Sequence, residues 1–250
     1  DLMKKEYRKK SSLVFIIFAY SIAFTAAWTT VLLVPGEWSI LLKGFAADII
    51  ATIVIFIFSL IVGNSSTYDP YWSLVPPVLY GYWIAQTPTA RGSGIIWLFF
   101  AVVCLWAVRL TMNWVINWKG LSQEDWRYIG FRNNFKKFYW IVSFFGIHLF
   151  PTIIVFIVSI PAYALIIGLQ HAVSGWAVVA VSAGTIIMLT GIVLEFVSDT
   201  QMFKFKQINE NRGKINTTGL WGYSRHPNYL GEITFWFGVG FFALSAGLEN

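Results

Sequence analysis

Long runs of apolar residues constrain the fold of this chain more than any other feature. About twenty apolar residues are enough for a helix to cross the hydrocarbon core of a membrane. The predicted spans are Leu13–Val34, Phe45–Val62, a shorter Leu74–Gln86, Ser93–Trp118, Phe138–Ile157, Ser174–Ser198 and Tyr229–Leu248. We therefore expect an all-α, polytopic membrane bundle of about seven transmembrane helices, forming a single domain over residues 1–250.

The composition supports lipid as the main solvent. Charged residues make up 12% of the chain and the mean hydropathy is +0.64, whereas a soluble domain carries about a quarter of its residues charged. The 13 Trp and 11 Tyr also fit a membrane protein, because their amphipathic rings favour the membrane–water interface.

The positions of the basic residues predict the topology. Three groups hold 15 of the 18 basic residues, and an alternating path with the amino terminus inside places all three on the cytoplasmic side. The groups are Lys4, Lys5, Arg8, Lys9 and Lys10; Lys119, Arg127, Arg132, Lys136 and Lys137; and Lys204, Lys206, Arg212, Lys214 and Arg225. This pattern indicates positive-inside topology, and we do not expect a nucleic-acid partner.

Proline positions predict where helices break or begin. Pro76 and Pro77 lack backbone donors and predict a broken third helix packed inside the bundle. Pro151 and Pro161 likewise predict a kink in the fifth span and a short interfacial piece after it. Pro227 suits the first turn of a helix.

The segment 219–232 is the richest in polar residues with a binding chemistry. Arg225 and His226 can hold phosphate oxygens, and Asn228 and Glu232 share one helix face and can bond an amide. The alternative is an interfacial loop in which long side chains reach the headgroups. The density of polar groups favours a site, because ionisable residues are costly inside a membrane.

A second polar segment closes the sixth span. Glu195 and Asp199 lie four residues apart and can bind cations, ribose hydroxyls or an arginine. A structural ion pair of Glu195 with Arg109 or Arg127 is an equal alternative. Lys206 suits a phosphate or a lipid headgroup.

A third polar segment follows the second span. Asp69 is flanked there by Tyr68, Tyr71 and Trp72, and a carboxyl among aromatic rings has a raised pKa and can act as an acid. The alternative is a turn that begins at Asp69-Pro70.

Span four adds Arg109 and Asn113, four residues apart. A buried guanidinium needs a carboxylate or an anionic ligand as its partner. The three histidines lie far apart in the sequence, so we expect no metal site. The Gly-x-Gly string that begins at Gly238 follows no strand and falls inside a predicted span, so it does not indicate a nucleotide site.

Taken together, these motifs resemble a known family. The segment Gly219–Glu232 closely resembles the signature of the bacterial DUF1295 family, within the steroid 5-alpha-reductase superfamily. Further matches in the same order are Asp69-x-x-Trp72, Leu105-Trp-x-x-Arg-Leu110, Glu124-Asp-x-Arg-Tyr128, and Glu195-x-x-x-Asp-x-Gln201 leading to Phe205-Lys206.

The resemblance implies a membrane reductase that uses NADPH to saturate an activated carbon–carbon double bond in a lipid such as a 3-oxo-steroid. It also implies a cofactor site that faces the cytoplasm, in a bacterial inner membrane. The expected cofactor-binding residues are Arg109, Asn113, Arg127, Asp199, Lys206, Tyr223, Arg225, His226, Asn228, Tyr229 and Glu232. Arg109 and Arg127 are expected near the phosphates.

The implied chemistry is hydride delivery to the β-carbon of an enone. Asp69 is the expected acid, and Tyr68 or Tyr71 would help to polarise the substrate carbonyl. The expected partners are the lipid substrate and the membrane lipids. The family usually continues into a carboxy-terminal helix and basic tail, which we expect this chain to lack.

Two alternatives remain open from the sequence. Isoprenylcysteine and phospholipid methyltransferases share a similar Arg-His-Pro-x-Tyr-x-Gly stretch and use S-adenosylmethionine. A non-catalytic, lipid-binding membrane protein with the same fold is the other alternative.

Overall fold

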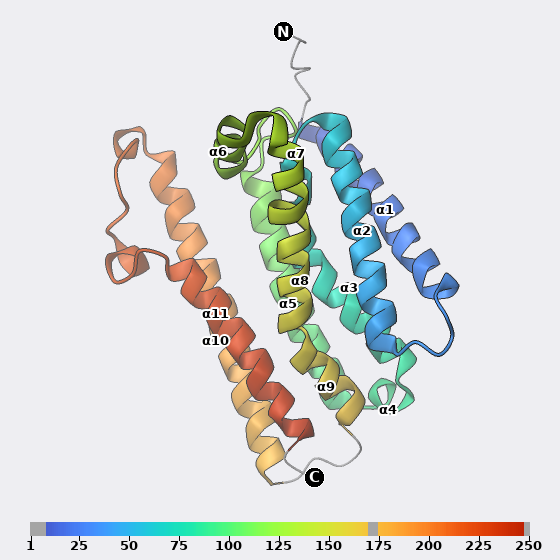
Figure 1. The fold of residues 1–250 in the computed structure, drawn as a ribbon. Helices are drawn as coiled ribbons and strands as arrows, with labels where there is room; N and C mark the ends of the chain where they lie inside the picture. The colour runs from blue at the N-terminus through green and yellow to red at the C-terminus, as the bar shows by residue number, and fades with distance from the viewer. Residues whose placement is uncertain (1–8, 170–174, 248–250) are drawn as a thin grey trace. The chain divides into compact units, whose positions relative to one another are not determined.

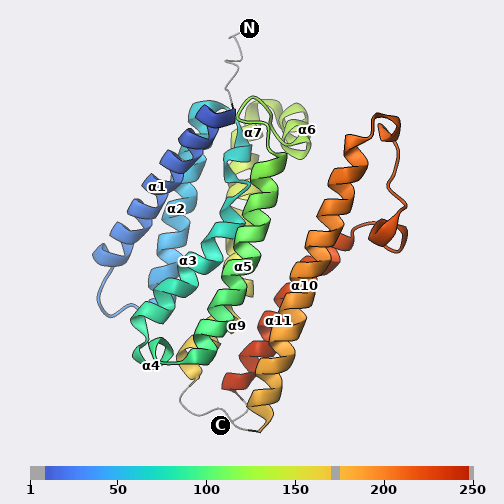
Figure 2. The same ribbon diagram turned by 180° about the vertical axis from the view of Figure 1, so that it is seen from behind.

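The computed structural model describes residues 9–169 and 175–247, and every regular element in those ranges is a helix (Figures 1 and 2). Within them, six helical segments are long and apolar enough to cross a membrane. The prediction of an all-α membrane protein is therefore confirmed in its class. The total of seven spans and the orientation of the amino terminus stay predictions.

The chain divides into two units, each with its own internal packing. The first unit comprises Asp1–Trp83 and Trp114–Ser159, and the second comprises Ile84–Asn113 and Ile160–Asn250. The expectation of a single domain stays a prediction.

The first unit is a helical bundle whose amino-terminal helices α1 and α2 run side by side (Figures 1 and 2). Small residues allow this packing, since Ala19 and Ala23 of α1 are buried in one cluster with Ala51 and Ile55 of α2. The helices of this unit are α1 (Lys9–Leu33), α2 (Ile40–Val62), the 3₁₀ helix η1 (Ser65–Tyr68), α3 (Tyr71–Gln86, which belongs to this unit as far as Trp83), α6 (Trp126–Phe135), η2 (Lys136–Phe138), α7 (Tyr139–Val142), the π-helix η3 (Ser143–Leu149) and α8 (Phe150–Val158).

Local sequence fixes the limits of α2. The Ser39 side chain accepts a hydrogen bond from the Leu42 amide (3.2 Å) and caps the start of the helix. Gly63 ends α2 in the left-handed conformation at φ 66°. The chain therefore turns directly into η1, which carries the polar residues of this unit.

The second unit is built around two long helices, α10 and α11, that pack side by side (Figures 1 and 2). Its helices are α4 (Pro88–Arg91), α5 (Gly94–Asn117, which belongs to this unit as far as Asn113), α9 (Ile160–Gly168), α10 (Trp176–Gln207), η4 (Asn209–Asn211), η5 (Gly219–Gly222), α11 (Pro227–Ala243) and η6 (Leu244–Ala246).

Four glycines bring α10 and α11 into close contact. A Cβ atom placed on Gly191 would lie 2.6 Å from the Phe235 amide nitrogen, and one on Gly238 would lie 2.7 Å from the Met188 amide nitrogen. Gly184 and Gly231 are equally crowded. Small residues of this kind allow helix backbones to approach closely inside membranes.

The predicted spans agree with the helices except at proline and polar positions. The third span is the 16-residue α3, which continues as a helix through Pro76 and Pro77, so the prediction of a broken helix is wrong. Two backbone donors are lost at these prolines, but the hydrogen bonds of the neighbouring turns maintain the helix. In the fifth span the α-helix gives way to the π-helix η3 shortly before Pro151, and the kink expected from Pro151 and Pro161 stays a prediction.

Other limits differ from the predicted ones by a few turns or fall outside the described residues. The helix α10 continues nine residues past the predicted end at Ser198, because polar residues can continue a helix although they end an apolar run. As predicted, α11 begins at Pro227. Positions outside the described residues are the predicted limits Ser174 and Leu248 and the basic residues Lys4, Lys5 and Arg8.

Candidate functional site

Two pairs of polar residues face each other inside the second unit. Arg109 of α5 forms an ion pair with Glu195 of α10, and its Nη1 donates to Asp199 Oδ2 at 2.9 Å. Asn113 Nδ2, one turn after Arg109, donates to the same Asp199 oxygen at 3.0 Å. The structure thus brings together three of the predicted cofactor residues, and it selects the Arg109–Glu195 ion pair expected as an alternative.

The helix α11 adds Glu232 to this unit. Its carboxylate accepts hydrogen bonds from Trp106 Nε1 (3.2 Å) and Trp236 Nε1 (2.7 Å). The Trp106 ring is held in turn by a stacked contact with Phe235, with centroids 4.8 Å apart. Glu232 is therefore held by one donor from α5 and one from the next turn of α11.

We call Arg109, Asn113, Glu195, Asp199 and Glu232 the α5–α10–α11 cluster. It holds three carboxyl groups against one guanidinium. Two of its buried atoms, Glu195 Oε1 and Arg109 Nε, have no hydrogen-bond partner among the described residues. The cluster therefore retains capacity to bind a further polar group.

The end of α10, the segment that follows it and the start of α11 carry a separate, exposed set of predicted residues. The side chains of Lys206, Tyr223, Arg225, His226 and Tyr229 are exposed, and Tyr223 is the extreme case at 93%. The His226 and Tyr229 rings stack at 5.1 Å. These five residues lie on the surface of the second unit rather than inside the cluster.

Two hydrogen bonds hold the segment between α10 and α11 against α10. Gln201 Oε1 accepts from the Leu220 amide at 2.9 Å, and Trp221 Nε1 donates to the Ser198 carbonyl at 2.9 Å. Gly219 adopts φ 59°, and a Cβ there would meet the Gln201 side chain. Asn228, at the start of α11, differs from its exposed neighbours because its Oδ1 is buried without a hydrogen-bond partner among the described residues.

Arg127, the remaining predicted cofactor residue, belongs to the first unit. It is exposed and makes two bonds to Asp125, from Nε at 2.8 Å and from Nη2 at 3.1 Å. Burial opposes ionisation of Asp125, but the hydrogen bonds from Arg127 lower its pKa below the ordinary value. The expectation that Arg109 and Arg127 share one phosphate site stays a prediction.

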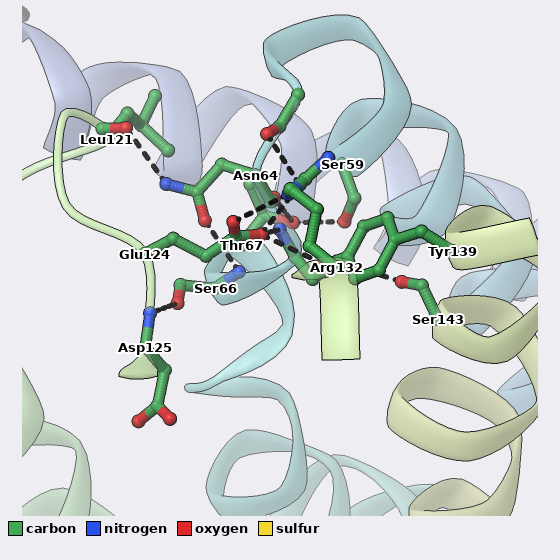
Figure 3. A network of polar contacts seen from close by, with 12 residues as sticks. Ser59, Asn64, Ser66, Thr67, Leu121, Glu124, Asp125, Arg132, Tyr139 and Ser143 are labelled. Carbon is green, nitrogen blue, oxygen red and sulfur yellow. Dashed lines mark hydrogen bonds and ion pairs between the residues drawn. The ribbon is translucent and has the colours of Figure 1, made fainter. Parts of the chain in front are cut away.

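A network of hydrogen bonds ties η1 to the loop after α5 (Figure 3). Asn64 Nδ2 donates to the Leu121 carbonyl at 2.8 Å, and the Ser65 amide donates to Glu124 Oε1 at 2.9 Å. Arg132 donates to both oxygens of Glu124, and its guanidinium lies 3.9 Å from the centre of the Tyr139 ring. This network fixes the segment that carries Tyr68 and Asp69.

Asp69 has a tyrosine partner that the sequence did not indicate. Its Oδ1 accepts a hydrogen bond from Tyr128 OH at 2.9 Å. Burial raises the pKa of Asp69 from 3.8 to about 7, although the Tyr128 bond lowers it in part. Asp69 can therefore hold a proton near neutral pH, as predicted from its aromatic surroundings.

The hydroxyls of Tyr68 and Tyr71 bond residues other than this acid. Their rings stack at 4.9 Å, while Tyr68 OH bonds Thr152 Oγ1 at 2.8 Å and Tyr71 OH donates to Asp48. The hydroxyls of Tyr68 and Tyr71 therefore have partners other than Asp69, and the expectation that they polarise a substrate carbonyl stays a prediction.

Asp48 is the residue that sequence reasoning missed. It lies in the apolar helix α2, is 6% exposed, and accepts from Tyr71 OH at Oδ1 (2.6 Å) and at its backbone carbonyl (2.8 Å). Its Oδ2 is buried and has no hydrogen-bond partner among the described residues. The available signal was a lone carboxyl inside a membrane span, which is costly and marks function by default.

Comparisons with known proteins place the chain in one family. The family model described as "Protein of unknown function (DUF1295)" matches residues 55–250. A relative in Schizosaccharomyces pombe, "Uncharacterized protein C594.04c", is 27% identical over 205 residues, which cover 69% of this chain and 56% of that protein. The chain thus spans little more than half the length of this relative. No solved structure matches.

Proposed function

The chain belongs to the DUF1295 family, and from this premise we propose that it is a membrane-embedded, NADPH-dependent reductase. Its substrate would be a steroid-like or other lipid with an activated carbon–carbon double bond, as the resemblance to the steroid 5-alpha-reductase superfamily implies. The observation that carries the proposal is the convergence of Arg109, Asn113, Asp199 and Glu232 from three helices.

The residues present suit NADPH in their chemistry. Carboxylates such as Asp199 and Glu232 can accept hydrogen bonds from ribose hydroxyls and an amide. Exposed Lys206 and Arg225 can hold phosphates, and Arg225 can do so with two parallel bonds. The buried Asn228 Oδ1 offers a further acceptor. The cofactor would supply a hydride, and these residues would bind and orient it.

The substrate carbonyl needs a hydrogen-bond donor, and the first unit holds two carboxyl–tyrosine pairs. One is Asp69–Tyr128, and the other is Asp48–Tyr71. We favour Asp48–Tyr71, because Asp48 lies within a membrane-crossing helix where a lipid substrate dissolves. Its Oδ2 is also still available for a bond. A neutral carboxylic acid beside a tyrosine stabilises the negative charge that develops on a carbonyl oxygen.

Variants of both acids test this assignment. Asp48→Asn should abolish turnover while NADPH binding survives, whereas Asp69→Asn should retain most of the turnover. Loss of turnover in Asp69→Asn but not in Asp48→Asn would instead assign the acid role to Asp69. Unchanged turnover in both variants would remove the carboxyl groups from the mechanism.

One observation favours the methyltransferase alternative. The α5–α10–α11 cluster has more carboxyl groups than cations, and Trp106 and Trp236 lie against Glu232. Carboxylates and indole rings together suit a positively charged sulfonium, as in S-adenosylmethionine.

Ligand titration of the purified protein separates the two functions. NADPH should bind saturably, and transfer of excitation energy from the protein's tryptophans to NADPH reports that binding. Asp199→Asn should weaken it, whereas Glu210→Gln, an exposed carboxyl in η4, should not. Saturable binding of S-adenosylmethionine without binding of NADPH would overturn the reductase proposal.

A further inference from the structure

The first unit buries an unusual number of polar side chains within its helices. Ser59, Thr67, Ser143 and His148 are 0% exposed, and Thr152 is 1% exposed. Polar residues inside a membrane bundle are costly, and chains of them mark proton pathways in membrane proteins. Their connections therefore indicate whether a proton can move through this unit.

One chain of side chains runs from Glu124 to His148. Tyr139 OH bonds Glu124 Oε1 at 3.0 Å and Ser65 Oγ at 2.7 Å. Ser65 Oγ bonds Ser143 Oγ at 2.8 Å, and Ser143 Oγ lies 3.5 Å from His148 Nδ1. Figure 3 shows Tyr139 and Ser143 beside the Glu124 network. Glu124 is partly exposed, and each later hydroxyl can both accept and donate a proton.

A second chain surrounds the Asp48–Tyr71 pair. Thr52 lies one turn after Asp48 on α2, and its hydroxyl bonds Thr152 Oγ1 at 2.8 Å. Thr152 Oγ1 also bonds Tyr68 OH at 2.8 Å. Thr152 therefore bonds Thr52, which lies one turn from Asp48, and Tyr68, whose ring stacks on that of Tyr71 at 4.9 Å.

His148 lies next to both chains. It is one turn before Thr152, whose hydroxyl donates to the His148 carbonyl at 2.9 Å, and its ring lies 4.9 Å from the Tyr68 ring. The ring donates from Nδ1 to the Ser143 backbone carbonyl at 2.9 Å, and its Nε2 bonds Ser59 Oγ at 2.9 Å. A rotation of the imidazole toward Thr152 would join the chains. His148 also lies in the π-helix η3, and π-helical turns are frequent at functional sites.

We propose that His148 relays protons from Glu124 at one end of the unit to the buried Asp48–Tyr71 pair. The proposal rests on the reductase function, because that reaction consumes one proton in each turnover. The hydride forms a carbon–hydrogen bond at the β-carbon and the electron pair of the double bond moves to the carbonyl oxygen. That oxygen takes the proton of Asp48, and the resulting enol becomes the saturated ketone. NADPH is oxidised to NADP⁺ and the enone is reduced. The relay then returns a proton to Asp48.

Infrared spectroscopy tests the relay without cofactor or substrate. The carboxylic acid band of Asp48, identified by its loss in Asp48→Asn, should shift quickly when the protein is moved from H₂O into D₂O. In His148→Gln and in Tyr139→Phe the exchange should slow by about tenfold or more, in line with the usual effect of removing a proton-transfer group. Tyr139→Phe keeps the ring beneath Arg132, so it serves as the variant that preserves the fold.

Tyr80→Phe is the matched control. It removes a buried hydroxyl of the same unit, bonded to Ser159 at 2.9 Å and outside both chains, and should leave the exchange rate unchanged. Equal rates in wild type, His148→Gln and Tyr139→Phe would overturn the relay. So would the absence of an Asp48 carboxylic acid band.

Turnover provides a second test that separates the relay from the reductase function. With NADPH and an enone lipid, His148→Gln should oxidise one equivalent of NADPH at the wild-type rate and then slow down, because Asp48 begins protonated. Added imidazole, a small proton carrier, should restore part of the later rate. A variant that matches wild type throughout overturns the relay alone. A wild type that oxidises no NADPH with an enone overturns the reductase function, while the infrared result stands by itself.

Discussion

The close contact of α10 and α11 makes Gly231→Ala a demanding test of the second unit. A Cβ at Gly231 would lie 2.6 Å from Glu195 Cγ, 2.8 Å from the Glu195 amide nitrogen and 2.9 Å from the Gly191 carbonyl oxygen. Comfortable contacts of this kind need about 3.5 Å. Because two of the three atoms belong to backbone, the helices must separate by several tenths of an ångström.

Gly240→Ala in the same helix is the control, since a Cβ there meets no atom of the described residues within 4 Å. Both variants gain the same helix preference of alanine over glycine, about 1 kcal/mol. The difference between them therefore isolates the overpacking cost, about 1–3 kcal/mol. Unfolding of the detergent-solubilised protein by increasing sodium dodecyl sulfate measures this difference.

The same variant should affect binding. Displacing Glu195 Cγ moves the carboxylate that pairs with Arg109, and a loss of about 1.4 kcal/mol would weaken NADPH binding about tenfold. Equal stability of Gly231→Ala and Gly240→Ala would refute the close packing of the two helices. Weakened stability with unchanged NADPH binding would separate the glycine contact from the cofactor site.

Three further variants test the polar contacts of the two units. Arg109→Met leaves Glu195 and Asp199 buried without their cation and should lower the free energy of unfolding by about 3–5 kcal/mol, measured by the same unfolding assay. Adding Glu195→Gln should restore part of the lost stability, and no restoration would contradict the ion pair. Because burial raises the pKa of Asp69 to about 7, the folded protein holds a proton between pH 4 and 7 that the unfolded chain has released, so wild type should lose stability as pH rises through that window. The loss of unfolding free energy should be at most about 4 kcal/mol, since Asp69 is partly exposed. The loss should be absent in Asp69→Asn, and parallel profiles of stability against pH in the two proteins would contradict the prediction. Asn64→Ala removes two bonds to the loop after α5 and should cost about 2–3 kcal/mol in unfolding free energy; a wild-type melting temperature would show that the loop is held by other contacts.

The sequence was sufficient for the long helices, because a membrane span must satisfy its backbone internally and therefore needs a long apolar run. It also paired the right residues where a helical repeat decides the geometry. Arg109 with Asn113, and Glu195 with Asp199, are each four apart, and the two pairs do face each other. Tertiary packing, however, decided which arginine Glu195 meets.

Other features depended on contacts between distant segments. Tyr128 and Asp69 are hydrogen-bonded although they are 59 positions apart in the sequence, and no local sequence pattern predicts that bond. Asp48 was missed because the surrounding run is strongly apolar on average, although a single carboxyl in such a run itself indicates a functional site. The continuity of α3 through Pro76 and Pro77 shows that surrounding helical turns can override a local breaking preference.

The most direct test of the reductase function follows the transferred hydrogen. The purified protein in lipid nanodiscs should be supplied with NADPH that carries deuterium on the nicotinamide ring, together with an enone lipid such as a 3-oxo-steroid. The proposal predicts a saturated product that carries the deuterium at its β-carbon, made by wild type and not by Asp48→Asn. Enone recovered without deuterium, from protein that instead transfers a methyl group from S-adenosylmethionine to a lipid, would contradict it.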